Sequence, residues 1–332
     1  MDNKEKCTIA KKTSIGGQAL MEGIMMRGPK KAVMAVRRPD GEMVIEDVDI
    51  KPLFKGKITK IPFVRGIFNF IDSMRVGYSS LMRSADISTL EELRQEEAPN
   101  TDGMSEEEKE KTLAAYEKKE KVTTDILMGV SLILSIALVV GLFFFLPAFL
   151  FDLCFKNVES FHNSNFFRSL FEGVIKFVIF LGYMYGVSFM KDIKRTFMYH
   201  GAEHKTIFCY ESGLDLTVEN VRKMSRFHPR CGTSFLVIML IVGILVGMLI
   251  PASLGKILRT AIKLLLLPLV MGIGYEVIKF AGKHDNWFIR MVSAPGLWFQ
   301  RISTKEPTDD MIECAIESLK AVIPDDNSDI IG

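Results

Sequence analysis

A run of 26 residues without a charge, Ile126–Phe151, constrains this chain more than any other feature of its sequence. With a rise of about 1.5 Å per residue, a helix of that length crosses a hydrocarbon core of about 30 Å. The chain has 332 residues and a mean hydropathy of +0.20, although 25% of the residues are charged. Apolar and charged residues must therefore occupy separate segments, as they do in membrane proteins.

Three further segments are candidates for membrane spans. Residues 231–255 form a second uncharged run, of 25 residues, whereas residues 169–190 and 261–281 contain a few ionisable side chains. Spanning segments that end in short connections are typical of helical bundles. The sequence therefore predicts a mainly α-helical, polytopic membrane protein with about four transmembrane helices.

The basic residues predict how these spans are oriented, because lysine and arginine near span ends stay in the cytoplasm. Eighteen of them lie in one set of segments, namely 106–125, 191–230 and 279–305, and five lie in the other set, 152–168 and 251–263. We therefore expect a multi-pass protein of the cell membrane with both ends of the chain in the cytoplasm.

The remaining charges limit the partners. The basic residues Lys256, Arg259 and Lys263 are three and four apart, so on a helix they would share one face and anchor it at the outer membrane interface. A net charge of +2 gives no electrostatic footprint for nucleic acid. The expected partners are membrane lipid and a peptide or lipid substrate, with no nucleic acid.

The segments outside the spans have their own organisation. Two β-prone runs flank Pro39-Asp40-Gly41 and predict a hairpin. Apolar residues at helical spacing predict an amphipathic helix over residues 62–84, which either packs on the hairpin, the favoured placement, or lies on the membrane surface. A second amphipathic helix begins after Thr308, and together they predict a small α/β cytoplasmic layer. The predicted regions are 1–85 (hairpin and helix), 86–121 (charged flexible linker), 122–282 (four spans with the 191–231 connection) and 283–332 (interfacial segment, interrupted at Pro295-Gly296, and last helix).

A metal site is predicted in the central connection. His200 and His204 are four residues apart, so their imidazoles lie on one face of a helix continuing from the second span. With Glu203 they form H-x-x-E-H, the inverted zinc-peptidase motif, in which two histidines bind zinc and the glutamate acts as general base. The alternative is a hydrogen-bonded interfacial cluster that serves the helix dipole.

A second cluster precedes the third span. His228 and Cys231 offer an imidazole and a thiolate, both accepted by zinc, at the membrane depth expected for His200 and His204. Either residue is equally well read as structural, a satisfied interfacial histidine or a small apolar side chain at a helix start. If both bind together with the two histidines, the site is closed, and closed zinc sites are structural.

Glu276 is the last candidate ligand, because an ionisable group within a membrane segment is costly. As a third ligand beside the two histidines it would leave one position open for water. It can instead pair with Lys279 or Lys176. On the second span, Glu172 and Lys176 are four residues apart, so we expect them to pair with each other.

Together these motifs resemble the YqhQ-like family, a bacterial domain of unknown function, over nearly the whole chain. The motifs that carry the resemblance are GGQALMEGIMMRGP (16–29), HGAEHKTIFCYE (200–211), HPRCGTSF (228–235), GYEVIKFAG (274–282) and APGLWFQRISTKEPTDD (294–310). The resemblance implies a metal-dependent membrane enzyme and supplies no substrate.

The leading hypothesis is an integral-membrane zinc hydrolase at the cytoplasmic face, with a peptide or lipid-headgroup substrate. Glu203 is the base, His200 and His204 are ligands, and Glu276, His228 or Cys231 completes the metal shell. The alternative is a non-catalytic transporter or assembly factor in which the His/Cys cluster is structural and Glu276 with Lys176 lines a polar path.

Overall fold

Three consecutive β-hairpin connections form the main sheet of the protein. The computed structural model describes residues 10–90, 123, 126–127, 129–251, 253–283 and 287–331. Within them, four strands form an antiparallel meander in chain order: β2 (Gly16–Leu20), β3 (Gly23–Arg27), β4 (Ala32–Arg37) and β5 (Met43–Val48). The hairpin predicted around Pro39-Asp40-Gly41 is confirmed, with Arg37 opposite Met43. The β2–β3 hairpin was not predicted.

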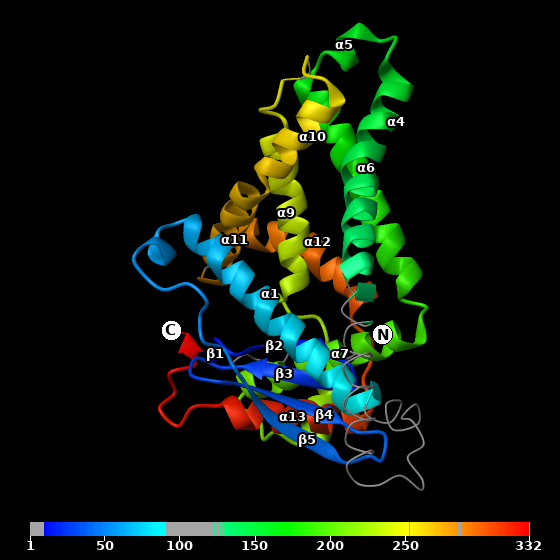
Figure 1. Ribbon diagram of the computed structural model, residues 1–332. Helices are drawn as coiled ribbons and strands as arrows, with labels where there is room; N and C mark the ends of the chain where they lie inside the picture. The colour runs from blue at the N-terminus through cyan, green and yellow to red at the C-terminus, as the bar shows by residue number, and fades with distance from the viewer. Residues whose placement is uncertain are drawn as a thin grey trace, which may run out of the picture.

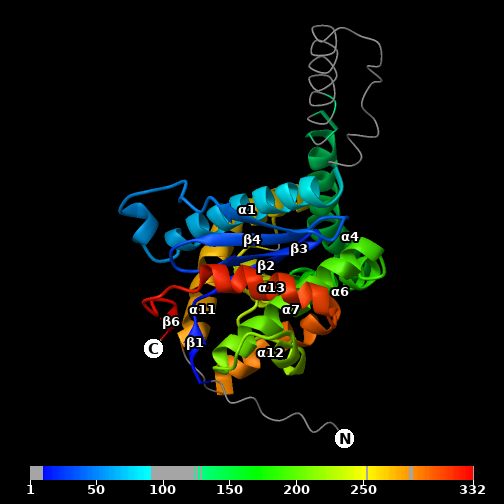
Figure 2. The same ribbon diagram turned by 90° about the horizontal axis from the view of Figure 1, so that it is seen from below.

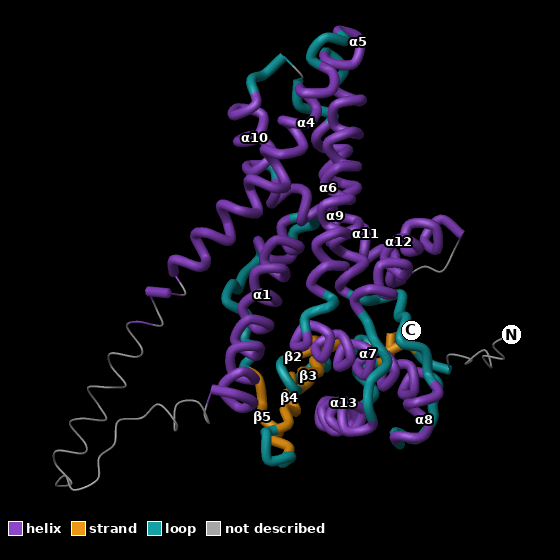
Figure 3. Tube along the Cα trace, turned by 90° about the vertical axis from the view of Figure 1, so that its right-hand side faces the viewer, coloured by secondary structure: helices purple, strands orange, loops and turns teal. Residues whose placement is uncertain are grey.

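Both faces of this sheet are buried, which explains why strand β4 reads as a continuous apolar run, AVMAV. Ile24, Met26 and Val33 point to one face and pack against α7 (Lys191–Glu211) and α13 (Asp309–Val322). Leu20 and Met34 point to the other face, where α1 (Val64–Ala85) covers them. Figures 2 and 3 show the sheet between these helices. The predicted packing of both amphipathic helices on the hairpin is confirmed.

A small second sheet and several short elements complete this α/β layer. Strand β1 (Lys12–Thr13) pairs antiparallel with β6 (Ile330–Ile331), so residues far apart in the sequence meet. Two short helical elements flank α1, η1 (Ile58–Lys60) and the π-helical η2 (Asp86–Leu90). Ile87 of η2 packs under the sheet, so the first residues of the predicted linker belong to the layer. The rest of that linker, residues 91–121, lies outside the described residues.

The short helix α8 (Val218–Lys223) packs on α7 and α13, and the remaining helices rise from the layer as a bundle (Figure 1). Two of them are long and apolar enough to cross a membrane. The first, Gly129–Phe155, includes the π-helical η3 (Gly141–Phe145) and α4 (Leu146–Phe155), and the short α5 (Glu159–His162) leads to the second, α6 (Asn165–Val187). These helices match the first two predicted spans.

The last two predicted spans have a different form. Helix α9 (Gly232–Gly247) is apolar but has only 16 residues, which is shorter than the first two spans. Helices α10 (Lys256–Leu265) and α11 (Leu267–Lys283) meet at a bend of 46°, and they give a third span only if the bent pair is counted as one. The mainly helical class is thus confirmed, whereas four spans remain a prediction.

Three local predictions are wrong. Helix α7 does not continue α6, because Ser188–Met190 separate the two helices. Helix α12 (Trp287–Ser303) is not interrupted at Pro295, since it packs along α9 and α6 and its Phe299 ring stacks on Phe180 at 4.9 Å. Arg259 and Lys263 are not surface anchors, because their side chains lie inside the bundle beside the carboxylates of Asp152 and Glu172 on α4 and α6.

Candidate metal centre

Helix α7 carries the H-x-x-E-H motif, and a glycine fixes its position. A Cβ on Gly201 would lie 2.0 Å from the backbone oxygen of Lys305, so only glycine allows the chain after α12 to cross α7 here. The Lys305 N–H also donates to the Phe197 carbonyl at 2.8 Å. The end of α12 is thereby held against the first histidine of the motif.

The two histidines of α7 are oriented by backbone carbonyl groups. Nδ1 of His200 lies 2.8 Å from the Ser303 oxygen, and Nδ1 of His204 lies 2.6 Å from the Arg226 oxygen. A carbonyl oxygen only accepts, so each Nδ1 carries a proton, and the tautomer that binds a metal would do so through Nε2. Such partners on the far ring nitrogen are typical of metal-ligating histidines.

Cys231 completes a group of three possible ligands. Nε2 of His200 lies 3.2 Å from Sγ of Cys231, and one ligand atom from each of His200, His204 and Cys231 lies within 4.8 Å of the others. Tetrahedral zinc with bonds of about 2.0–2.3 Å places its ligand atoms roughly 3.3–3.8 Å apart. Cys231 also directly precedes α9, whose positive dipole end favours a negatively charged ligand. These residues fit a zinc ion with three protein ligands.

Glu203 is buried on the side of α7 that faces the sheet. Its Oε1 accepts a hydrogen bond from the Gly17 N–H at 3.0 Å, and a Cβ on Gly17 would lie 2.9 Å from the Glu203 carboxyl carbon. Burial raises the pKa of Glu203, against the opposing effects of His200 and of the Gly17 hydrogen bond. The two glycines that begin β2 therefore leave room for this side chain.

A cavity of about 470 Å³ borders the same strand. Ser14, Gly16, Gly17 and Gln18 line it together with residues of β3 and α1. It lies next to the backbone that holds Glu203, whereas His200, His204 and Cys231 are not among its lining residues.

His228 does not join the three ligands. Its backbone N–H and carbonyl bond to the Gln300 side chain, both at 2.8 Å, and its Nδ1 accepts from the Arg230 N–H at 3.3 Å. Nε2 therefore carries the proton and faces Glu211 at 3.5 Å. Burial lowers the pKa of His228, although the bond to Glu211 acts in the opposite direction.

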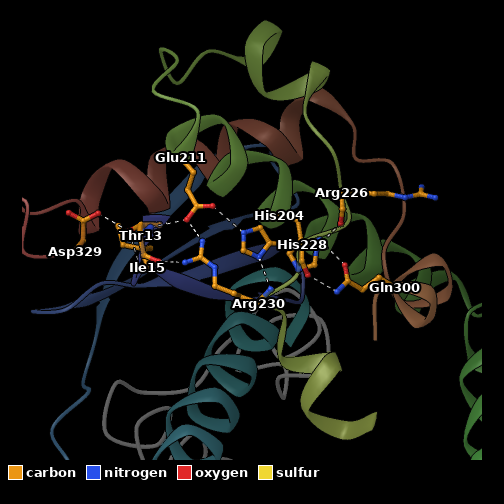
Figure 4. A network of polar contacts seen from close by, with 9 residues as sticks. All are labelled: Thr13, Ile15, His204, Glu211, Arg226, His228, Arg230, Gln300 and Asp329. Atoms are coloured by element: carbon orange, nitrogen blue, oxygen red, sulfur yellow. Dashed lines mark hydrogen bonds and ion pairs between the residues drawn. The ribbon is translucent and has the colours of Figure 1, made fainter. Parts of the chain in front are cut away.

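Glu211 is the centre of a buried network that includes His228 (Figure 4). It accepts from the Thr13 N–H at 2.8 Å and forms an ion pair with Arg230. Burial alone would raise the pKa of Glu211, but the bonds from His228, Thr13 and Arg230 lower it below its usual value. The Thr13 hydroxyl donates to Asp329 at 2.7 Å, which ties the network to residues near β6.

Glu276 lies apart from the histidines, on α11. Its carboxylate binds the Arg65 guanidinium through two bonds, 2.6 Å from Nε to Oε1 and 2.5 Å from Nη2 to Oε2. The Phe63 N–H adds a third donor at 3.3 Å. Its partner is thus an arginine of α1, rather than Lys279, Lys176 or the three-ligand group.

Several residues of this region were not identified from the sequence. Glu211, Arg230 and Gln300 position His228, and the Ser303 and Arg226 carbonyls orient the ligands. Gln300 is the one with a readable signal, since a polar residue on the apolar side of an amphipathic helix requires a buried partner. Backbone carbonyls leave no signal in a sequence.

The fold and the site define a mainly helical protein with two helices that could cross a membrane and a His–His–Cys group beside an α/β layer. The family described as protein of unknown function DUF1385 matches residues 61–325. The chain is 37% identical over 314 residues to the uncharacterized protein YqhQ of Bacillus subtilis strain 168. The aligned residues cover 93% of this chain and 92% of that protein. No solved structure matches. The chain therefore belongs to the DUF1385 family, and its resemblance to YqhQ-like proteins is confirmed.

Proposed function

We propose that this protein is an integral-membrane zinc hydrolase that acts at the cytoplasmic membrane face. The observation that carries the proposal is the convergence of His200, His204 and Cys231, with both Nδ1 atoms engaged by carbonyl groups. Three protein ligands leave one tetrahedral position open, as in catalytic zinc sites. Zinc bound there would act as a Lewis acid and activate water.

Glu203 is the proposed general base, since it is next to His204 in the chain and its pKa is raised by burial. The Gly17 N–H holds the carboxylate, so substrate entry must release or share this bond. The substrate class is a peptide or a lipid headgroup. The cavity beside Gly17 supports entry of a polar chain from the β2 side.

The membrane placement of the proposal is four spans with the α/β layer in the cytoplasm. It rests on the excess of lysine and arginine in residues 106–125, 191–230 and 279–305. Protease treatment of sealed inverted vesicles should cleave exposed sites in the 212–220 loop, and intact spheroplasts should protect them. Cleavage from the outside in spheroplasts would reverse the orientation.

The metal content of the detergent-purified protein tests the site. Wild-type protein should hold about one zinc per chain, and His204→Ala or Cys231→Ser should lose it. Glu203→Gln should keep the metal. Glu276→Gln and His228→Gln should also keep it, because these two side chains face Arg65 and Glu211. Absence of zinc from every protein, wild type included, would overturn the proposal.

A structural His/Cys cluster in a transporter or assembly factor is the second candidate. It is favoured by the burial of His204 and Cys231 and by the engagement of Glu203 with a backbone N–H. Hydrolysis assays with fluorogenic peptides and phospholipid micelles separate the candidates. Activity that is lost in metal-bearing Glu203→Gln supports the hydrolase, and zinc without any hydrolysis supports the structural cluster.

A further inference from the structure

A cluster of charged side chains lies between the candidate membrane helices, far from the metal centre. Glu172 on α6 forms ion pairs with Lys263 of α10 and with Arg168, the latter at 3.1 Å. Arg168 in turn reaches Asp152 of α4 at 3.1 Å, and Asp152 pairs with Lys256 at 2.8 Å. The carboxylates are thus shared, each between two cations.

Positive charge exceeds negative charge in this cluster. Arg259 lies close enough to Glu172, Arg168 and Asp152 to interact with all three, and Lys176 lies near Glu172 and Lys263. The group therefore has five cationic and two anionic side chains, an excess of three positive charges among the described residues. Uncompensated charge is costly inside a membrane, so such an excess indicates a missing anion.

Arg259 shows the imbalance directly. Its side chain is only 2% exposed, and its Nη1 donates to the carbonyl groups of Ile250 and Pro251 at 2.8 and 2.5 Å. Its Nε and Nη2 have no hydrogen-bond partner among the described residues. Two buried donors of a guanidinium are rarely left unpaired in a native structure.

A cavity of about 390 Å³ opens beside the cluster. Its walls are mostly apolar side chains of α6, α9, α11 and the first span, among them Phe144 and Phe180, and its charged residues are Glu172, Lys176 and Lys263. The apolar part of the first span is exposed in the structure. This helix therefore forms the wall between the cavity and the surrounding lipid. The volume lies in the range of small-molecule sites.

Lys176 is the cation available to a ligand in this cavity. It is the middle residue of α6, about 17 Å from the helix start at about 1.5 Å per residue. Its Nζ lies 4.9 Å from the centre of the Phe144 ring, and the described structure gives it no carboxylate within ion-pair distance. A lysine at that depth marks a functional site.

We propose that this cavity binds an anionic phospholipid, with the headgroup at Lys176 and Lys263 and an acyl chain along α6 and α9. Net positive charge selects an anionic over a zwitterionic headgroup, and the apolar walls select a lipid over a free anion. This site is separate from the metal centre, because none of its lining residues belongs to α7 and none is His200, His204 or Cys231.

Native mass spectrometry of the full-length protein in detergent tests the charge. Wild type should retain phosphatidylglycerol at least about fivefold better than phosphatidylcholine, and Lys176→Gln should remove most of this preference. Lys156→Gln is the control, since it removes the same charge from an exposed lysine that does not line the cavity. Equal retention of the two lipids by wild type would overturn the proposal.

Filling the cavity tests its shape without removing any charge. Gly243 lines the cavity, and a Cβ there meets no atom within 4 Å, so Gly243→Leu should fold and displace the lipid. Gly182→Leu on α6 is the control, because Gly182 is equally open and lies outside the cavity. Unchanged phosphatidylglycerol retention in a monodisperse Gly243→Leu protein would contradict the site even if Lys176→Gln does not fold.

Discussion

The network around Glu211 in the α/β layer and the cluster around Glu172 between the candidate membrane helices both bury ion pairs, but their charge balance differs. Glu211 meets one arginine, one neutral histidine and one backbone N–H, all from its own chain. In the part of the chain that the structure describes, the cations around Glu172 and Asp152 outnumber these carboxylates, and two donors of Arg259 have no hydrogen-bond partner.

This difference separates two uses of buried charge. A balanced network fixes geometry, and here it holds His228, Thr13 and the segment before α9 in place around the three possible ligands. An unbalanced cluster leaves an attraction for something outside the chain. The first is therefore sensitive to loss of a partner, whereas the second should tolerate loss of one cation when no ligand is present.

Glu211→Ala should have the largest effect, because it removes the carboxylate of the balanced network and leaves an excess of positive charge there, as in the cluster around Glu172. It leaves Arg230 and the Thr13 N–H without their carboxylate, and breaking a buried pair costs about 3–5 kcal/mol. Denaturant unfolding in detergent measures the loss. Glu219→Ala removes an exposed partner of Lys223 on α8 (Val218–Lys223) and should leave the midpoint unchanged. Equal midpoints for the two variants would mean that the network contributes no stability.

Gly201→Ala tests a further difference between the two regions, which is that Gly201 of α7 is closely packed whereas Gly186 of α6 borders open space. The added methyl meets the Lys305 carbonyl at 2.0 Å, and overpacking of this kind costs about 1–3 kcal/mol. Because Lys305 follows the carbonyl that orients His200, zinc content should fall with stability. Gly186→Ala on α6 meets no atom within 4 Å and should change neither quantity. A stable, zinc-bearing Gly201→Ala protein would show that the crossing at α7 is looser than the structure indicates.

Acid should weaken the balanced network by the smallest amount. The pKa of His228 is lowered by burial, so as pH falls the unfolded chain takes up this proton before the folded chain does. The stability contribution is therefore complete above about pH 6.5 and is lost as pH falls toward the folded pKa, by at most about 1.4 kcal/mol per unit. Glu211, Arg230 and His204 are the ionisable groups that face the ring.

Unfolding midpoints of chelator-treated protein between pH 8 and 5.5 measure this effect, since removal of metal separates it from ligand protonation. His228→Gln should flatten the profile in that window. A midpoint that rises on acidification would mean that the charged pair of His228 and Glu211 gains more than burial costs.

The sequence was sufficient to predict those elements whose pattern depends only on neighbouring residues. The turn at Pro39-Asp40-Gly41 and the helical spacing in residues 62–84 depend only on neighbouring residues, and the structure confirms both. The β2–β3 hairpin gave no such signal, because its turn uses Met21 and Glu22, and Glu22 adopts a positive φ of 50° without glycine. Pro295 suggested a break that helix packing prevents.

The site was predictable in its residue types and less so in its pairings. His200, His204 and Cys231 come together because α7 and the start of α9 meet, which their shared position next to the membrane segments suggested. The pairing of Glu276 with Arg65 joins residues 211 positions apart and depends on how α1 crosses α11. Only the tertiary packing decides such a partner.

The wide separation in sequence between the main sheet and the helix α13 that covers it has a consequence for biosynthesis. The nascent chain completes β5 at residue 48, yet α13, which covers one face of that sheet, begins at residue 309. At about 5–20 residues per second the ribosome needs roughly 10–50 s for this interval, during which the candidate membrane helices are also made. The apolar face of the sheet that α13 covers is therefore synthesised well before its partner helix, and it has to stay exposed or contact another surface until α13 has been made.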